Sequence, residues 1–211
     1  MRVRFRSFQL AVKNVCDCVL SALMLGLLAP LLFGIALAVI LQSGWPVIFV
    51  QARVGRDGRS FKVYKFRTMV HGASDKGLMT TVAVNDDRIT RIGMLLRKWS
   101  LDELPQLVNV LKGDMSLIGP RPTLEHQVSQ YTPRQRRRLE VKPGITGWAQ
   151  VNGRNALPWA RRIELDIWYI DNFTLWLDAK ILLRTVGVFL RREGLYGQGG
   201  VNDNFGTKRN L

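Results

Sequence analysis

Acidic residues and cysteines are scarce in this sequence. Only 16 of its 211 residues are Asp or Glu, against 31 Lys or Arg, so the formal net charge is +15. Such a charge favours a polyanionic partner: nucleic acid, anionic lipid or a phosphorylated substrate. The two cysteines, Cys16 and Cys18, lie two positions apart, where a helix points them to different sides and leaves no geometry for a disulfide. This favours a reduced location that faces the cytosol.

Several motifs of familiar enzymes are missing as well. The sequence has no Walker-type phosphate loop, no G-x-G-x-x-G after a strand, no H-E-x-x-H and no D-x-D. No Cys/His cluster is present, which argues against a structural zinc site. The two histidines, His71 and His126, lie in polar segments without a serine or cysteine partner, so a hydrolytic triad has little support.

One long stretch has no charge at all. Residues 18–52 contain no Asp, Glu, Lys or Arg, and residues 19–41 are almost entirely apolar. About 20 apolar residues suffice to cross a bilayer, so we expect retention in a membrane. Both flanks are basic, which gives no preferred orientation, and Pro30 near the middle deletes a helical hydrogen bond. We therefore expect a re-entrant helix kinked near Pro30, with a straight span as the alternative.

The rest of the chain predicts a mostly helical α+β fold. Asp57-Gly58 between two β-branched and aromatic segments predicts a small β-hairpin. Its alternating basic and aromatic residues suit a half-buried strand beside a membrane better than a nucleic-acid patch. Apolar spacing predicts amphipathic helices over 89–99 and 174–194, the second lying in the headgroup plane or buried in the core. The expected organisation follows three ranges: a membrane helix (1–45), a catalytic domain (46–194) and a loose tail (195–211).

Two adjacent carboxylates, Asp102 and Glu103, stand where a helix is predicted over 100–113. The helix is predicted from apolar side chains at i, i+3, i+4 and i+7, which are Leu104, Leu107, Val108 and Leu111. Ser100 with Glu103 fits a capping box, whereas Pro105 fits better if Asp102 is the cap. In either case the helix dipole favours ionised carboxylates, which then serve as caps, as ligands of a divalent metal, or as a nucleophile.

Three segments together resemble one family. They are SLDELPQLVNVLKGDMSLIGPRP, VKPGITGWAQVNGRN and LDIWYIDN, within a resemblance that covers about residues 8–192. The chain is identified as a member of the bacterial sugar transferase family, similar to its small monotopic (PglC-like) phosphoglycosyl transferases. The resemblance implies transfer of a sugar 1-phosphate from a UDP-sugar, by analogy an N-acetylated amino sugar, to polyprenyl (undecaprenyl) phosphate. UMP would be released, at the cytoplasmic face of the bacterial inner membrane.

The resemblance also implies roles for particular residues. Asp102 is the expected nucleophile of a ping-pong route through a phosphosugar-aspartate, and Asp102 and Glu103 are the expected ligands of Mg²⁺. Contacts to phosphate and uridine are expected from three arginines at motif positions, Arg97, Arg121 and Arg154. Asp166 also occupies a motif position and is expected at the substrate, with a structural salt bridge as the alternative.

The expected partners are therefore the UDP-sugar, the polyprenyl phosphate and anionic lipids of the inner membrane, and not nucleic acid. Two other classes of protein stay open at this point. One is a basic membrane-bound scaffold or nucleic-acid binder without chemistry. The other is a metal-dependent glycosyltransferase, which would move the sugar without its phosphate and release UDP instead of UMP.

Overall fold

The protein is seen in a computed structural model that describes residues 2–73 and 86–191, so the predicted tail at 195–211 lies outside the described residues. Its helices and strands are these, with short 3₁₀ turns marked η: α1 Arg2–Ser43, β1 Ile48–Val54, η1 Arg56–Gly58, β2 Ser60–Phe66, α2 Arg91–Lys98, η2 Leu101–Glu103, α3 Gln106–Leu111, β3 Ser116–Ile118, α4 Glu125–Val128, α5 Pro133–Arg136, η3 Arg137–Leu139, β4 Gly144–Thr146, α6 Trp148–Val151, η4 Arg154–Ala156, α7 Trp159–Asp171 and α8 Leu175–Arg191. The mostly helical α+β class is confirmed.

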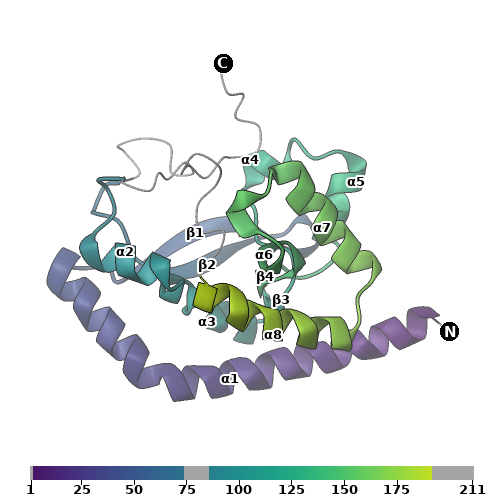
Figure 1. The fold of residues 1–211 in the computed structure, drawn as a ribbon, viewed down its shortest axis with the longest axis horizontal. Helices are drawn as coiled ribbons and strands as arrows, with labels where there is room; N and C mark the ends of the chain where they lie inside the picture. The colour runs from purple at the N-terminus through teal and green to yellow at the C-terminus, as the bar shows by residue number, and fades with distance from the viewer. Residues whose placement is uncertain (1, 74–85, 192–211) are drawn as a thin grey trace.

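The long apolar helix α1 lies along one side of the molecule, below α8 and α3 in the view of Figure 1. Residues 7–43 of this helix are long and apolar enough to cross a membrane, by length and composition alone. Pro30 lies inside the helix. The axis of α1 changes direction between the end beside α8 and the end beside α2 (Figure 1).

The first half of α1 is tied to the globular part by a buried ion pair. Lys13 Nζ lies 2.6 Å from Asp178 Oδ2 on α8, and the Tyr169 hydroxyl donates to the other oxygen of Asp178 at 2.7 Å. One turn further along α1, Asp17 accepts a hydrogen bond from the backbone N–H of Leu117 on β3. Because unpaired buried charges are costly, these contacts hold this end of α1 against α8 and β3.

The second half of α1 is held by packing and by an arginine. Val39 of α1 packs in one apolar cluster with Phe66 of β2 and Leu96 of α2. Arg67, directly after β2, donates to the carbonyls of Ser43 at 2.5 Å and Trp45 at 2.9 Å, and also to that of Gly44. The Ser43 carbonyl is one that the end of a helix leaves unpaired, and a cation suits the negative end of its dipole. Both ends of α1 therefore contact the same globular domain.

The predicted β-hairpin is confirmed. Strands β1 and β2 pair antiparallel from Ile48 opposite Phe66 to Val54 opposite Ser60, so the turn spans residues 55–59. Asp57 and Gly58 both adopt positive φ, at 57° and 77°, the conformation that favours these residue types in hairpin turns. Phe49 pairs with Lys65, so these two side chains lie on the same face of the hairpin.

The free edge of β2 is covered by the short helix α3. The Asn109 side chain is fully buried, accepts from the backbone N–H of Tyr64 at 3.1 Å and donates to the carbonyl of Lys62 at 2.6 Å. These two bonds satisfy strand groups that would otherwise be unpaired. The main core joins β2, α3, β3, α7 and α8 through buried apolar side chains, among them Val63, Leu107, Ile118, Ile170 and Ile181.

Candidate active site

One cavity of about 740 Å³ brings together five of the six residues that the sequence predicts for the site. They are Arg97, Asp102, Glu103, Arg121 and Arg154. They come from α2, η2, the loop after β3 and η4, so segments separated by more than 50 residues in sequence meet here. Two further cations, Arg53 of β1 and Lys65 of β2, line the same cavity. The cavity is therefore electropositive and also contains two carboxylates, and such a cavity suits a phosphorylated ligand.

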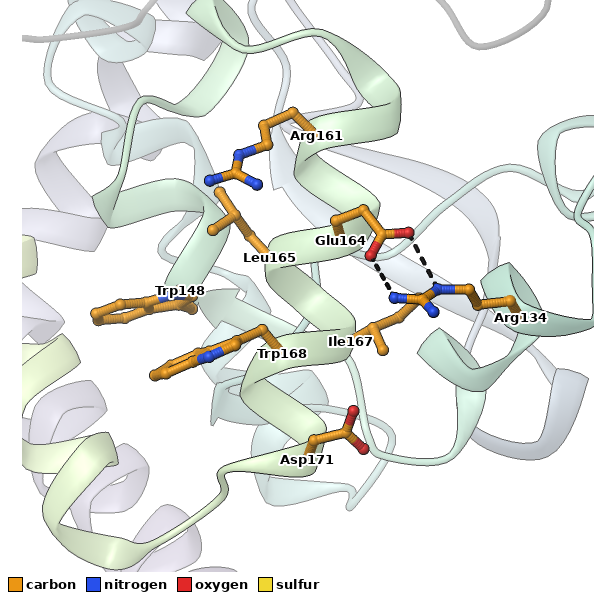
Figure 2. A pocket seen from close by; sticks show the side chains of 8 residues that line it. All are labelled: Arg134, Trp148, Arg161, Glu164, Leu165, Ile167, Trp168 and Asp171. Atoms are coloured by element: carbon orange, nitrogen blue, oxygen red, sulfur yellow. Dashed lines mark hydrogen bonds and ion pairs between the residues drawn. The ribbon is translucent and has the colours of Figure 1, made fainter.

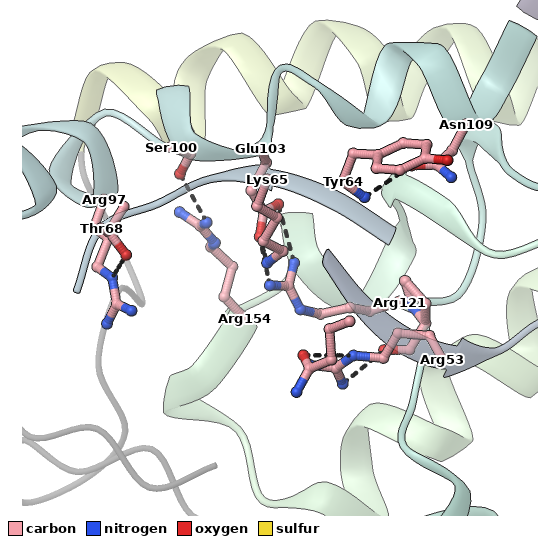
Figure 3. Close-up of polar contacts among 12 residues, drawn as sticks. Arg53, Tyr64, Lys65, Thr68, Arg97, Ser100, Glu103, Asn109, Arg121 and Arg154 are labelled. Carbon is pink, nitrogen blue, oxygen red and sulfur yellow. Dashed lines mark hydrogen bonds and ion pairs between the residues drawn. The ribbon is translucent and has the colours of Figure 1, made fainter. Parts of the chain in front are cut away.

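Glu103 lies at the centre of the charge arrangement. Its Oε1 accepts from Lys65 Nζ at 2.8 Å and from the Arg121 guanidinium at 2.6 Å, and its Oε2 accepts from the same guanidinium at 3.2 Å (Figure 3). The Arg121 contact is thus bidentate, the geometry in which arginine binds a carboxylate most strongly. Glu103 is buried, and its negative charge is compensated on both sides.

The two neighbouring carboxylates differ in acidity. Burial alone would raise the pKa of Glu103, but Arg121 and Lys65 outweigh it and hold that pKa well below its usual range. For Asp102, burial and the negative charge of Glu103 raise the pKa above its usual range, although Lys65, Arg97 and Arg121 oppose this. Glu103 is therefore the fixed anion, and Asp102 is the more basic of the two groups.

The local backbone around the pair differs from the helix predicted over 100–113. Leu101–Glu103 form a 3₁₀ turn, and α3 begins only at Gln106, with Pro105 before it. The predicted capping box is wrong, because Ser100 has a left-handed conformation and its side chain caps no backbone N–H. A helix dipole would favour the ionised form of both carboxylates. In the structure, burial and neighbouring charges dominate instead, and they shift the two pKa values in opposite directions.

Two residues of the cavity have an unusual backbone. Ser100 has φ 51° and Arg154 has φ 50°, and the Arg154 guanidinium donates to the Ser100 hydroxyl at 3.1 Å (Figure 3). A non-glycine residue in this region costs about 1–3 kcal/mol and persists where surrounding contacts impose it. Both strained residues bear polar side chains on the same cavity, which is typical of a functional site.

Arg97 and Arg53 are held at the cavity wall by polar neighbours. Arg97 Nε donates to the Thr68 hydroxyl at 2.8 Å, and Arg53 donates to the Gln51 side chain at 2.6 Å. Burial and the nearby Arg121 lower the pKa of Arg53 to about 10. Both guanidiniums are therefore fixed in orientation before any ligand arrives, which favours binding of phosphate oxygens.

Sequence reasoning missed Lys65 and Arg53. Lys65 lies on a strand with alternating basic and aromatic residues, and its carboxylate partner stands 38 positions away in the sequence. Burial lowers the pKa of Lys65, and the charge of Glu103 opposes this. One signal could have found it. A lysine on a half-buried strand is rarely buried unless it is paired, and this chain has few carboxylates that could be its partner.

Asp166 is placed elsewhere, in a buried ion pair. Its Oδ2 accepts from Arg138 Nε at 2.6 Å, and Arg138 also donates to the Tyr131 hydroxyl at 2.7 Å and to the backbone carbonyl of Arg121 at 3.0 Å. Burial raises the pKa of Asp166, although Arg138 opposes this. Asp166 thus fits the salt-bridge alternative. Its partner Arg138 also holds the backbone that bears the Arg121 guanidinium.

The carboxylate pair can serve a divalent metal ion only with help from a ligand. Within residues 2–73 and 86–191 no group of three or more His, Cys, Asp or Glu side chains could hold a metal. Among the described residues, none donates a hydrogen bond to the Asp102 carboxylate, whereas both oxygens of Glu103 accept hydrogen bonds from Arg121. Mg²⁺ binds through one or two carboxylates and takes its other ligands from phosphates and water, so these residues fit it.

A second cavity of about 320 Å³ lies against α7, and Figure 2 shows its lining. Trp148 and Trp168 stack with ring centroids 5.0 Å apart, and Arg134 pairs with Glu164 at 2.7 Å. None of the sequence-predicted site residues lies on this cavity. Its charges are partly neutralised by their own ion pair, so anion binding is concentrated in the larger cavity.

The fold and the site define a class: a protein with a membrane-length apolar helix and, beside it, a basic cavity that holds two unequal carboxylates. Comparison with known proteins is consistent with this class. The model of the family described as bacterial sugar transferase matches residues 8–192, and the chain belongs to that family. The family predicted from the three sequence motifs is thereby confirmed.

Individual relatives extend the comparison. The chain is 53% identical to the uncharacterized sugar transferase EpsL of Bacillus subtilis, over 78% of this chain and 80% of the relative. It is 46% identical to the UDP-glucose:undecaprenyl-phosphate glucose-1-phosphate transferase of Escherichia coli, over 83% of this chain and 39% of the relative. It is 42% identical to the undecaprenyl-phosphate galactose phosphotransferase of Salmonella typhimurium, over 88% and 42%. The chain therefore spans about two fifths of the length of the latter two proteins.

The buried pair of Asp166 and Arg138 generates a prediction on stability. Asp166→Asn removes the counter-charge of a buried guanidinium, so the free energy of unfolding is expected to fall by about 3 kcal/mol. Denaturant titration of the purified protein in detergent micelles measures this. The double variant Asp166→Leu/Arg138→Met is the matched control and is expected to lose less, because it removes both charges together. A single variant as stable as the wild type would contradict the role given to the pair.

Proposed function

We propose that this protein transfers a sugar 1-phosphate from a UDP-sugar to polyprenyl phosphate and releases UMP, as a first membrane step of glycoconjugate assembly. The observation that supports this most is the pair of carboxylates with opposite pKa shifts among eight lysine and arginine side chains, in a cavity beside the end of a membrane-length helix. The names of the Escherichia coli and Salmonella typhimurium relatives describe reactions of this kind.

In the proposed reaction Asp102 is the nucleophile. Its carboxylate oxygen attacks the phosphorus bonded to the sugar, the bond from that phosphorus to the bridging oxygen breaks, and the electron pair leaves with UMP. An acyl phosphate of the sugar then occupies Asp102. A phosphate oxygen of the polyprenyl phosphate attacks the same phosphorus, restores the Asp102 carboxylate and forms the sugar-diphosphate lipid. Donor and acceptor thus use one site in turn.

The choice of Asp102 over Glu103 rests on the geometry. Both oxygens of Glu103 are engaged by Lys65 and Arg121, and its lowered pKa makes it a weak nucleophile. The raised pKa of Asp102 makes its ionised form more nucleophilic. Glu103 then keeps Lys65 and Arg121 oriented toward the phosphates, where charge is redistributed during the transfer.

The remaining arginines have a proposed role at the donor. Arg97, Arg121 and Arg154 line the cavity that holds the nucleophile, and each offers several N–H donors to phosphate oxygens or to uridine. Mg²⁺, when bound, would be held by Asp102 and Glu103 together with the diphosphate and would neutralise part of its charge.

The membrane topology is a further part of the proposal. We propose that α1 enters the cytoplasmic face of the bacterial inner membrane and returns, with its bend near Pro30. The support is that Lys13 near one end of α1 and Val39 near the other both contact the same globular domain. A straight span would place those ends on opposite sides of the bilayer. On α8, Trp176 and Leu183 are 76% and 73% exposed, which suits a helix resting among lipid headgroups and contacting anionic lipids.

This topology is tested by cysteine labelling in a variant with Cys16 and Cys18 replaced by serine. Cysteines are introduced one at a time, at Ser7 near the start of α1 and at Ser129 on the surface of the globular domain. We expect a membrane-impermeant thiol reagent to label both positions only after the cells are permeabilised. Labelling of position 7 but not of position 129 in spheroplasts would mean that α1 crosses the membrane.

The reaction itself is tested by product analysis. Purified protein is incubated with undecaprenyl phosphate, Mg²⁺ and a panel of UDP-sugars. The panel includes N-acetylated amino sugars, expected by analogy with the family, and glucose and galactose, which are named in the relatives. UMP is expected from at least one donor, and Asp102→Asn is expected to lower its rate by at least about 10³-fold, because the amide cannot act as the nucleophile. UDP instead of UMP would point to a glycosyltransferase, and normal turnover by Asp102→Asn would refute the assignment of the nucleophile.

A further inference from the structure

The large cavity has an apolar part that the proposed phosphate chemistry does not use. Pro46, Phe49, Met69, Val70 and Met94 line it together with the cations. Phe49 and Met94 are 39% and 52% exposed on this cavity, and apolar side chains grouped at a cavity commonly mark a ligand-binding site. A UDP-sugar has no aliphatic chain, so a ligand that carries such a chain matches this wall better.

The apolar residues of this wall lie next to cations on the same elements or on paired strands. On β1, Phe49 lies opposite Lys65 in the strand register, so its ring shares the face from which Lys65 reaches Glu103. On α2, Met94 lies one turn before Arg97, and both line the cavity. Each wall therefore has an apolar side chain next to a cation, an arrangement that matches a ligand with an apolar chain attached to a phosphate.

The apolar part of the cavity also lies near the C-terminal end of α1. Pro46 and Phe49 follow shortly after the end of α1, and α2 packs on that end through Leu96 and Val39. Leu41 in the last turn of α1 and Trp45 just after the helix are 79% and 74% exposed. A chain that leaves the bilayer along the end of α1 would meet Trp45 and then Phe49 before it reaches Lys65.

We infer that Phe49 and Met94 form a subsite for the isoprene units next to the phosphate of the acceptor lipid. The inference rests on the proposed function and adds a location for one of its two substrates. In this arrangement the isoprenoid chain lies between β1 and α2, and its phosphate points to Lys65 and Arg97. The UDP-sugar is then held by the cations alone, without help from these apolar side chains.

Steady-state kinetics separates the two substrates. Phe49→Asn and Met94→Gln are each expected to raise the KM for undecaprenyl phosphate about tenfold, since each removes an apolar contact with the chain. The KM for the UDP-sugar, and kcat at saturating acceptor, are expected to stay within about twofold, because no proposed donor contact changes. Leu95→Gln is the matched control: Leu95 is also 52% exposed on α2 but lies outside the described lining of the cavity.

Each alternative outcome has a distinct meaning. An unchanged acceptor KM in both variants, or an equal rise in Leu95→Gln, would overturn the subsite. A wild-type protein that forms UMP from no UDP-sugar would instead refute the proposed function, and the subsite with it. A measurement on the wild type does not depend on the folding of variants: a polyprenyl phosphate analogue with a benzophenone near its phosphate is expected to crosslink to Phe49 or Met94. Crosslinks confined to α8 would overturn the subsite.

Discussion

The contact between the Glu103 carboxylate and its two cations is the interaction on which the rest of the site depends. Lys65 arrives from the hairpin and Arg121 from the loop after β3, and both meet Glu103 on η2. Each of these segments is held by a further hydrogen bond: β2 by the Asn109 side chain, and the Arg121 backbone by the Arg138 guanidinium. Because a buried charge is tolerated only when it is paired, these supports and the ion pairs stabilise one another.

The same contact separates the chemistry of two adjacent carboxylates. Glu103 is held ionised by Arg121 and Lys65, whereas burial together with the negative charge of Glu103 raises the pKa of Asp102. One group then organises the cations while the other is available for covalent chemistry. Pairs of carboxylates whose surroundings move their pKa values apart are a recurring way to assign different roles to similar side chains. In this protein burial and the charge of Glu103 raise one pKa, and side chains of the loop after β3 and of the hairpin lower the other.

Sequence patterns predicted those parts of the protein that depend on neighbouring residues. The apolar run gave α1, Asp57-Gly58 predicted the hairpin, and the motif around Asp102 located the cavity. Long-range contacts could not be predicted in this way. Lys65 was missed because its partner is 38 positions away, and the Ser100 capping box failed because Ser100 adopts a left-handed conformation and accepts from Arg154 instead. The partner of Asp166 likewise lies 28 positions away, on another element.

We propose that Glu103 organises the cations so that Asp102 becomes the nucleophile. Mass spectrometry of the denatured wild-type protein, after incubation with its UDP-sugar and no acceptor, tests this most directly. The expected result is a mass increase of one sugar phosphate that fragmentation locates on Asp102 and that polyprenyl phosphate removes. An unmodified protein under these conditions, with UMP formed only when both substrates are present, would contradict the claim.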